Sequence, residues 1–424
     1  MSYTNEYQTA LRHIEERNAH MQNLSYFLDT AARWHAFFED GATIEGQPGT
    51  PNPVVVVLGH GIPEQLIYAC HTTPLYLLGG SHESCAWSDD AVPRDSDPAS
   101  RSILGYALRI CRRTDVDPLF VVPMVNDNMR KVAYLLAREG HAVLSVDILP
   151  EVVDVTERRA WERSLQTMVH GVAKHVGRRA SARSIRAAER LVSEARAAML
   201  DFERAAATCE GVLSGEAALL VLSTYYMTGD LAQWSTMVRR LTVETRARCQ
   251  GSNRLGVDAP RVLAIGSPLL FPQYKVPNLI HDAGMSLVAS VDAASTSRYA
   301  SLSAQELRGG FSSLIGTIAR RHYTLDSSSA HVVNGAMEQY VEHLISAMEV
   351  DGVICHILKG QIEYDFLLAR LEPLFNKYDI PVFRLETDYQ YQDVEQLRIR
   401  LEAFAEMLEQ RSIALSQQRV RRSA

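Results

Sequence analysis

Short runs of β-branched and other apolar residues recur along the chain, and each run leads through a turn into a helical pattern. Strands that alternate with helices assemble as βαβ units, in which neighbouring strands are parallel. The sequence therefore predicts an α/β protein with two parallel sheets. The predicted strands lie at residues 54–58, 119–125 and 141–147 in the first half of the chain, and at 261–266, 285–290, 352–356 and 380–384 in the second half.

A long stretch without a strand pattern, residues 152–248, separates the two sets of strands. It is rich in Ala, Arg, Glu and Leu and is predicted to be helical. Helical spacing also precedes a proline- and glycine-rich break at 46–53, and Asp393 is a suitable N-cap for a last amphipathic helix. The predicted organisation is an N-terminal helical segment at 1–50, a first α/β domain at 51–150, a helical region at 151–257, a second α/β domain at 258–390, and a C-terminal helix and tail at 391–424.

Charge and composition argue against nucleic acid and membranes as binding partners. Asp and Glu number 50 against 43 Lys and Arg, a net charge of −7, whereas nucleic-acid-binding domains usually carry a basic excess. No apolar run approaches the ~20 residues that cross a bilayer, and the first residues show no signal-peptide pattern. The six cysteines include no CxxC pair, which argues against a zinc knuckle. We therefore expect a cytoplasmic protein that binds neither nucleic acid nor membrane.

Ligands of parallel sheets bind beyond the carboxyl ends of the strands, where the strand-to-helix loops meet. Four such loops stand out, at residues 59–63, 126–127, 266–268 and 356–361. The chain contains no GxGxxG, Walker or HExxH motif, so dinucleotide-binding, P-loop and zincin sites have no support.

Several of these segments resemble the 2-hydroxyacyl-CoA dehydratase family, which includes the benzoyl-CoA reductase subunits, and in particular its D-component type. One is Gly-Ile-Pro-Glu-Gln-Leu-Ile-Tyr-Ala-Cys-His-Thr-Thr-Pro at 61–74, and another is Arg-Val-Leu-Ala-Ile-Gly-Ser-Pro at 261–268. The most specific is the C-terminal block, with Asp-Gly-Val-Ile at 351–354, Arg-Leu-Glu-Thr-Asp-Tyr at 384–389 and Gln-Leu-Arg-Ile-Arg-Leu-Glu-Ala-Phe at 396–404. The resemblance implies two flavodoxin-like α/β domains with the site in the cleft between them.

The chemistry that this resemblance implies is reductive. A four-iron four-sulfur cluster, held by three cysteines, lies beside the bound acyl-CoA thioester, and a separate ATP-dependent activator protein delivers one electron. The resulting ketyl radical expels the hydroxyl group. In this chain Asp97, Asn126 and Gln361 stand at the three cysteine positions, while the neighbouring motif residues persist. Because such clusters need soft thiolate ligands, we expect no cluster and no other metal in this chain.

The three replaced positions are still expected to meet at the carboxyl ends of their strands, facing the cleft between the domains. The volume left by a cluster must be refilled because protein interiors tolerate few voids, and the expected fillers are His71, Met129 or Tyr364, or ordered water on the three polar side chains. A displaced set of thiol ligands is an alternative, although free cysteines are more often small core residues. The thiols that could form such a set are Cys85, Cys111 and Cys355.

The candidate functional residues come from the same loops. Asp97 and His60 are the candidate catalytic groups: Asp97 is the one acid among the replaced positions, and His60 could face a thioester carbonyl. Such histidines, however, often only satisfy backbone groups. The candidate substrate-binding residues are Ile62, Pro63, Glu64, Arg101, Arg130 and Ser267. The two arginines either bind an anion or pair with Asp97 and Asp127, and Ser267 either offers N–H groups to a phosphate or belongs to a simple turn.

Three functions remain open at this point. The first is a cluster-less subunit of a dehydratase-type or reductase-type complex, a lyase or an oxidoreductase. It would act on an acyl-CoA with a paralogous subunit that carries the iron–sulfur cluster, as a heterodimer or failing that a homodimer, with the ATP-dependent activator as a further partner. The second is a stand-alone acyl-CoA-binding protein or non-redox enzyme that reuses the cleft. The third is a scaffold without a ligand.

Overall fold

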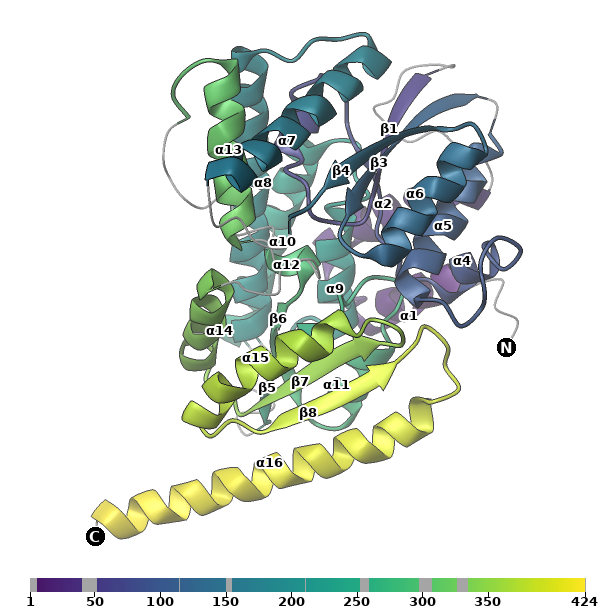
Figure 1. Ribbon diagram of the computed structural model, residues 1–424. Helices are drawn as coiled ribbons and strands as arrows, with labels where there is room; N and C mark the ends of the chain where they lie inside the picture. The colour runs from purple at the N-terminus through teal and green to yellow at the C-terminus, as the bar shows by residue number, and fades with distance from the viewer. Residues whose placement is uncertain are drawn as a thin grey trace.

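The computed structural model describes residues 6–39, 52–113, 115–149, 155–209, 211–251, 259–296, 307–325 and 335–423. Two four-stranded sheets, both entirely parallel, form the centres of two α/β domains that helices join and flank (Figure 1). The predicted fold class, with two flavodoxin-like domains and a helical middle region, is confirmed.

The first sheet has the strand order β2-β1-β3-β4. Its strands are β1 (Asn52–Leu58), β2 (Leu75–Leu77), β3 (Val116–Met124) and β4 (Ala142–Asp147). The valine run of β1 is completely buried, as expected for a central strand of a parallel sheet with covered faces. The long helices that pack against this sheet are α5 (Pro98–Cys111), α6 (Asp127–Arg138) and α7 (Val155–Val176).

The second sheet repeats this arrangement with the order β6-β5-β7-β8. Its strands are β5 (Arg261–Gly266), β6 (Ser286–Val291), β7 (Gly352–Leu358) and β8 (Val382–Thr387). Alternate residues of β5 enter different hydrophobic clusters: Leu263 packs with residues of α15 (Glu363–Lys377), whereas Val262 and Ala264 pack with residues of α16 (Val394–Ser423). Both faces of this sheet are therefore also covered.

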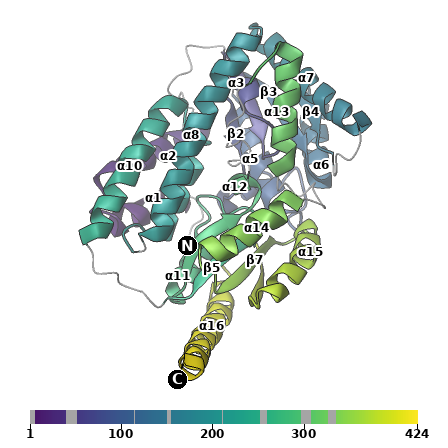
Figure 2. The same cartoon turned by 90° about the vertical axis from the view of Figure 1, so that its left-hand side faces the viewer.

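The helical middle region forms a layer together with the N-terminal helices (Figure 2). The layer contains α8 (Ala182–Thr208), α9 (Gly215–Thr224) and α10 (Leu231–Gly251), which lie beside α1 (Glu6–Arg17) and α2 (Ser25–Glu39), whereas α7 of the same region packs against the first sheet. Trp234 of α10 and Phe27 of α2 are fully buried against one another in the same hydrophobic core that supports the first sheet. The remaining elements are η1 (Gln22–Leu24), α3 (Gln65–Tyr68), α4 (His82–Ala86), α11 (Lys275–Asp282), α12 (Ala293–Thr296), α13 (Phe311–Leu325) and α14 (Gly335–Ala347).

Three local features differ from the sequence-based expectation. Strand β2 was not predicted, because three residues are too few to show an alternation or a run. Strands β7 and β8 continue two and three residues beyond their predicted ends at 356 and 384. Strands β1 and β3 begin two and three residues before their predicted starts at 54 and 119. Most of the predicted break, residues 46–51, lies outside the described residues.

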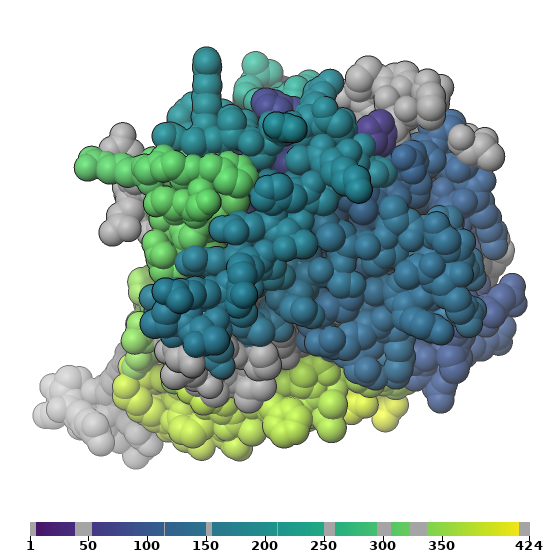
Figure 3. Space-filling model, turned by 45° about the horizontal axis from the view of Figure 1, so that its top comes forward, coloured from purple at the N-terminus to yellow at the C-terminus, as the bar shows by residue number. Residues whose placement is uncertain are grey.

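The two α/β domains are in direct contact, and the space-filling view shows the second domain in yellow-green against the first in blue (Figure 3). An apolar interdomain cluster lies at this contact, with Cys85 and Ala99 from the first domain and Leu358 and Tyr389 from the second. In the described part of the chain, no helix combines the length and the apolar character that a membrane span requires.

Candidate functional site

Three loops from the two domains meet through a chain of hydrogen bonds. Asp97 precedes α5 in the first domain, whereas Ser267 and Gln361 follow β5 and β7 in the second. The Ser267 hydroxyl donates to Gln361 Oε1 at 2.6 Å, and Gln361 Nε2 donates to Asp97 Oδ1 at 2.9 Å. Asp97 is 3% exposed and Gln361 is 6% exposed, so this junction is shielded from water. Asp97 and Gln361 therefore meet, as predicted. The expected place at a strand end holds for Gln361, which follows β7, whereas Asp97 lies between α4 and α5.

The carboxylate of Asp97 is also the N-cap of α5. Its Oδ1 accepts from Ala99 N at 3.1 Å, and its Oδ2 accepts from Ser100 N at 3.0 Å and from Ser100 Oγ at 2.5 Å. Burial raises the pKa of Asp97 above its ordinary value, and these hydrogen bonds oppose the shift because they stabilise the charged form. Both carboxylate oxygens therefore accept hydrogen bonds, from the first turn of α5 and, at Oδ1, also from Gln361 of the second domain.

The turn at Ser267 fixes the second-domain side of this junction. Leu358 N donates to Ser267 Oγ at 2.9 Å, and Ser267 N donates to the His356 carbonyl oxygen at 2.8 Å. Gly266 has φ +110°, and a Cβ atom there would lie 2.3 Å from the same His356 oxygen, so only glycine allows this close approach. Burial lowers the pKa of His356 to about 4, and its neutral ring lies with Nδ1 2.9 Å from the Ser267 carbonyl oxygen. The backbone N–H of Ser267 is thus used in a hydrogen bond to strand β7.

Asn126, the third replaced position, makes a second contact between the domains. Its Oδ1 accepts from Met129 N at 3.0 Å, so Asn126 is the N-cap of α6, and its Nδ2 donates to Glu363 Oε1 at 3.3 Å. Glu363 lies two residues after Gln361 at the start of α15. Met129 in turn places its sulfur 3.8 Å from the Ser100 hydroxyl that bonds Asp97. The side chains around the three replaced positions are thus connected through direct contacts.

Of the three expected fillers, Met129 is buried at the junction beside Ser100. Tyr364 is buried in the core of the second domain. The expectation for His71 is wrong: this residue is exposed, has φ +58°, and its backbone forms hydrogen bonds, from its N–H to the Tyr68 carbonyl oxygen at 2.9 Å and from Arg178 Nη1 to its own carbonyl oxygen at 3.3 Å. Tyr389, which was not predicted to have this role, fills space at the domain contact beside Cys85 and Leu358.

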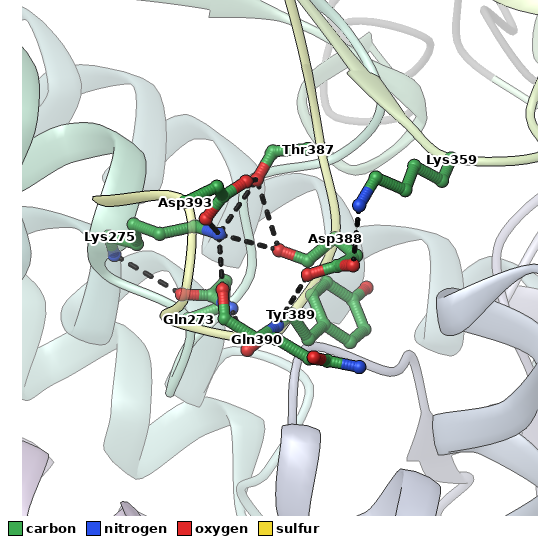
Figure 4. Close-up of polar contacts among 8 residues, drawn as sticks. All are labelled: Gln273, Lys275, Lys359, Thr387, Asp388, Tyr389, Gln390 and Asp393. Atoms are coloured by element: carbon green, nitrogen blue, oxygen red, sulfur yellow. Dashed lines mark hydrogen bonds and ion pairs between the residues drawn. The ribbon is translucent and has the colours of Figure 1, made fainter. Parts of the chain in front are cut away.

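A buried lysine holds the loop that carries Tyr389 (Figure 4). Lys275 Nζ donates to Thr387 Oγ1 at 2.7 Å, to the carbonyl oxygens of Asp388 and Gln390 at 2.8 and 2.5 Å, and to Asp393 Oδ1 at 2.8 Å. Burial lowers the pKa of Lys275, and the interaction with the Asp393 carboxylate opposes this shift. The lysine therefore acts as a fixed cross-link between the start of α11 and the loop from β8 to α16.

The first loop forms a separate polar centre. Glu64 Oε1 accepts from Arg196 Nη2 at 2.7 Å and Nε at 3.0 Å, and also from the Tyr225 hydroxyl. Tyr76 donates to Glu64 Oε2 at 3.4 Å. Glu64 and Arg196 are both buried, so this candidate substrate-binding carboxylate is committed to an internal ion pair.

The other candidates of the first loop lie beside this ion pair. Ile62 and Pro63 are buried, whereas His60 is half-buried. The ring centroid of His60 lies 5.2 Å from that of Tyr226, with the two planes nearly perpendicular. Tyr226 also donates to the Ala294 carbonyl oxygen at 3.1 Å, which links the first loop to the second domain.

The two candidate arginines are placed differently from one another. Arg101 Nη2 bonds Asp89 Oδ1 at 2.6 Å, and Nη1 donates to the Arg94 carbonyl oxygen at 2.7 Å. Its carboxylate partner is therefore Asp89 and not the predicted Asp97. Arg130 is exposed on α6. The predicted partner of Arg130, Asp127, instead pairs with Lys131 at 2.7 Å.

The three thiols of the alternative ligand set do not come together. Cys85 lies in the interdomain cluster, Cys355 lies in the core between the second sheet and α15, and Cys111 packs against the first-domain core. Burial raises the pKa of all three thiols, to about 12 for Cys111 and Cys355, so they stay protonated at neutral pH. Within the described residues, no group of three or more His, Cys, Asp or Glu side chains is arranged to hold a metal ion.

Several residues of this site could not be chosen from the sequence. Ser100, Glu363 and Lys275 carry no motif of their own, and Arg196 lies in the strand-free middle region, 132 residues from its partner Glu64. Tyr389 stands inside the C-terminal signature at 384–389, so its motif was the one available signal.

The fold and the site define a class of protein: two parallel-sheet α/β domains whose strand-end loops meet at one buried junction. The sequence model of the family described as 2-hydroxyglutaryl-CoA dehydratase, D-component, matches residues 60–408. The chain belongs to this family. A search of curated proteins found no match.

Proposed function

We propose that this chain is a cluster-less subunit of a 2-hydroxyacyl-CoA dehydratase-like or benzoyl-CoA reductase-like complex in the cytoplasm. A paralogous partner subunit would carry the four-iron four-sulfur cluster, and the two together would act on an acyl-CoA thioester. The observation that carries the proposal is the hydrogen bond from Gln361 to Asp97 at 2.9 Å, made between two positions where the family resemblance places cluster cysteines.

The donor set at this junction does not fit an iron–sulfur cluster. The three positions offer a carboxylate and two amides, whereas clusters are held by thiolates. The Asp97–Gln361 hydrogen bond also brings the two side chains into direct contact, and the Ser267 hydroxyl donates a further hydrogen bond to Gln361. The role proposed for these residues is therefore to join the two domains, and the chain would supply the walls of the cleft.

One observation favours a second function, a stand-alone enzyme with Asp97 as a general acid. Burial raises the pKa of Asp97, as it does for many catalytic carboxylic acids. Against this function, both oxygens of Asp97 accept hydrogen bonds from the start of α5 and from Gln361. A proton donor must reach its substrate, and this carboxylate is turned into the junction, so the subunit function is preferred.

An exposed apolar pair beside the junction offers a surface for the partner subunit. Ile362 is 66% exposed and Phe366 is 62% exposed, and they flank Glu363, which bonds Asn126. Exposed aliphatic and aromatic side chains in one place are typical of protein–protein interfaces. We propose this pair as part of the contact with the cluster-bearing subunit.

The metal content of the purified chain tests the proposed function. We expect the chain prepared alone without oxygen to be colourless, and a preparation with its cluster-bearing paralogue to contain iron and acid-labile sulfide in proportion to the paralogue. A variant with Asp97→Cys, Asn126→Cys and Gln361→Cys is the matched control, because it restores three thiolates to the same loops. Cluster-level iron in the unmodified chain alone would contradict the proposal, and so would a monodisperse monomer that binds no paralogue.

The proposed contact surface predicts a loss of association in one variant. Ile362→Asp places a charge in the apolar patch, so we expect it to weaken the complex with the paralogue by at least about tenfold, since central interface residues often contribute more than 1.4 kcal/mol. Light scattering and titration calorimetry measure the change. Ile399→Asp is the control, because Ile399 on α16 is equally exposed at 66%. Equal effects of the two variants would show that the patch around Ile362 is not the contact.

A further inference from the structure

A cavity of about 370 Å³ lies between the helical layer and the second α/β domain, and none of the candidate site residues lines it. One wall is built from the end of α8, residues 211–215 and α9. The other wall is built from α11, α14 and the edge strand β6. A volume of this size is within the range of small-molecule sites, which are usually concave and mostly apolar.

Much of the lining of this cavity is apolar. Leu200 and Val212 from the helical layer and Met285 and Leu344 from the second domain line it and are buried. Leu287 of β6 also lines it and is only half-buried, so apolar surface is left open to the cavity. Covering such surface with an alkyl chain is favourable, because apolar area is removed from water.

The rim of the cavity carries cationic and N–H-donating side chains. Arg204 from α8, His281 from α11 and His343 from α14 line it and are exposed. Among the described residues, none of these three side chains has an ion-pair or hydrogen-bond partner. The one acidic side chain in the lining is Glu203. The rim therefore complements a negatively charged group.

We propose that this cavity binds an amphipathic carboxylate, a free fatty acid or a similar molecule. Its alkyl chain would lie against Leu200, Met285 and Leu287, and its carboxylate would accept hydrogen bonds from Arg204 and the two histidines. Charge-assisted hydrogen bonds to a guanidinium are the strongest contacts available to such a group. The ligand would touch both the helical layer and the second domain, and the proposal is independent of the proposed function.

Titration calorimetry on the full chain with decanoate tests this proposal. We expect saturable binding of one decanoate per chain. Ala218 and Ala289 are half-buried residues on opposite walls of the cavity. Ala218→Phe or Ala289→Phe fills the cavity and should abolish binding. Two variants are used so that a folding defect in one, visible by circular dichroism, leaves the other informative.

A second experiment tests the role of the ligand's carboxylate separately from that of its alkyl chain. Arg204→Ala should weaken decanoate binding by about tenfold, the usual effect of losing one hydrogen bond to a charged group, and should leave the binding of 1-decanol unchanged. Arg190→Ala, an exposed arginine on the same helix that does not line the cavity, is the control. Absence of decanoate binding, or binding that neither cavity-filling variant changes, would overturn the proposal. Binding of decanoyl-CoA without decanoate would overturn it too, because the site would then take the thioester.

Discussion

Replacing Arg196 by methionine is expected to lower the free energy of unfolding by about 3–5 kcal/mol, because the carboxylate of Glu64 would be left buried without its cation. The guanidinium makes two hydrogen bonds to Glu64 Oε1, at 2.7 and 3.0 Å, and both side chains are buried. Loss of a buried ion-pair partner is among the largest effects that one substitution produces. Urea denaturation followed by circular dichroism measures it.

Two controls separate the buried charge from other effects of the substitution. Arg246→Met removes an ion pair with Asp201 of similar length, 2.6 Å, but both partners are exposed, so we expect a loss below about 1 kcal/mol. Adding Glu64→Gln to Arg196→Met should recover part of the stability, since a neutral amide can still accept from Tyr225. If Arg196→Met is no more harmful than Arg246→Met, the ion pair does not stabilise the first loop as the geometry indicates.

Lys275→Met is expected to have the second-largest effect, a loss of about 3 kcal/mol. The ammonium group has four acceptors, and its removal leaves Asp393 without its cation and takes one donor each from the part-buried carbonyl oxygens of Asp388 and Gln390. Besides lowering the urea midpoint, the change should increase hydrogen exchange in residues 387–393, because the lysine fixes that loop. This local readout distinguishes loss of the cross-link from a general loss of stability.

Lys359→Met is the matched control for this prediction. Lys359 also contacts the loop, through Asp388 Oδ2 at 2.9 Å, but it is exposed and has a single partner. Its loss should change stability by less than about 1 kcal/mol. Increased exchange in residues 387–393 of Lys359→Met, equal to that of Lys275→Met, would contradict the role given to the buried lysine.

The strands and the junction were predictable for different reasons. The valine run of β1 and the apolar run of β7 are visible because a buried parallel strand needs continuous apolar residues between turn residues. Asp97, Asn126 and Gln361 could be placed because each stands in a recognisable motif frame, and the structure indeed joins Asp97 to Gln361. Strand β2 gave no signal because three residues show no pattern.

The partners of the charged residues could not be predicted from the sequence. The sequence around Glu64, Arg101 and Lys275 does not distinguish a residue that contacts a ligand from one that pairs with another residue of the chain. The structure places Glu64 on Arg196, Arg101 on Asp89 and Lys275 on a loop more than 100 residues away. The pairings of Glu64 and Lys275 depend on the packing of elements more than 100 residues apart, to which local spacing contributes no information.

The position of Asp97 couples the start of α5 to the contact between the domains. Its carboxylate caps the first turn of α5 and also receives the hydrogen bond from the second domain. Any hinge motion that separates Gln361 from Asp97 therefore acts on the residue that begins α5, and fraying of that first turn releases one of the links between the domains. We therefore expect domain opening and fraying of the first turn of α5 to occur together. The stability of the contact between the domains would then depend on the N-cap of α5.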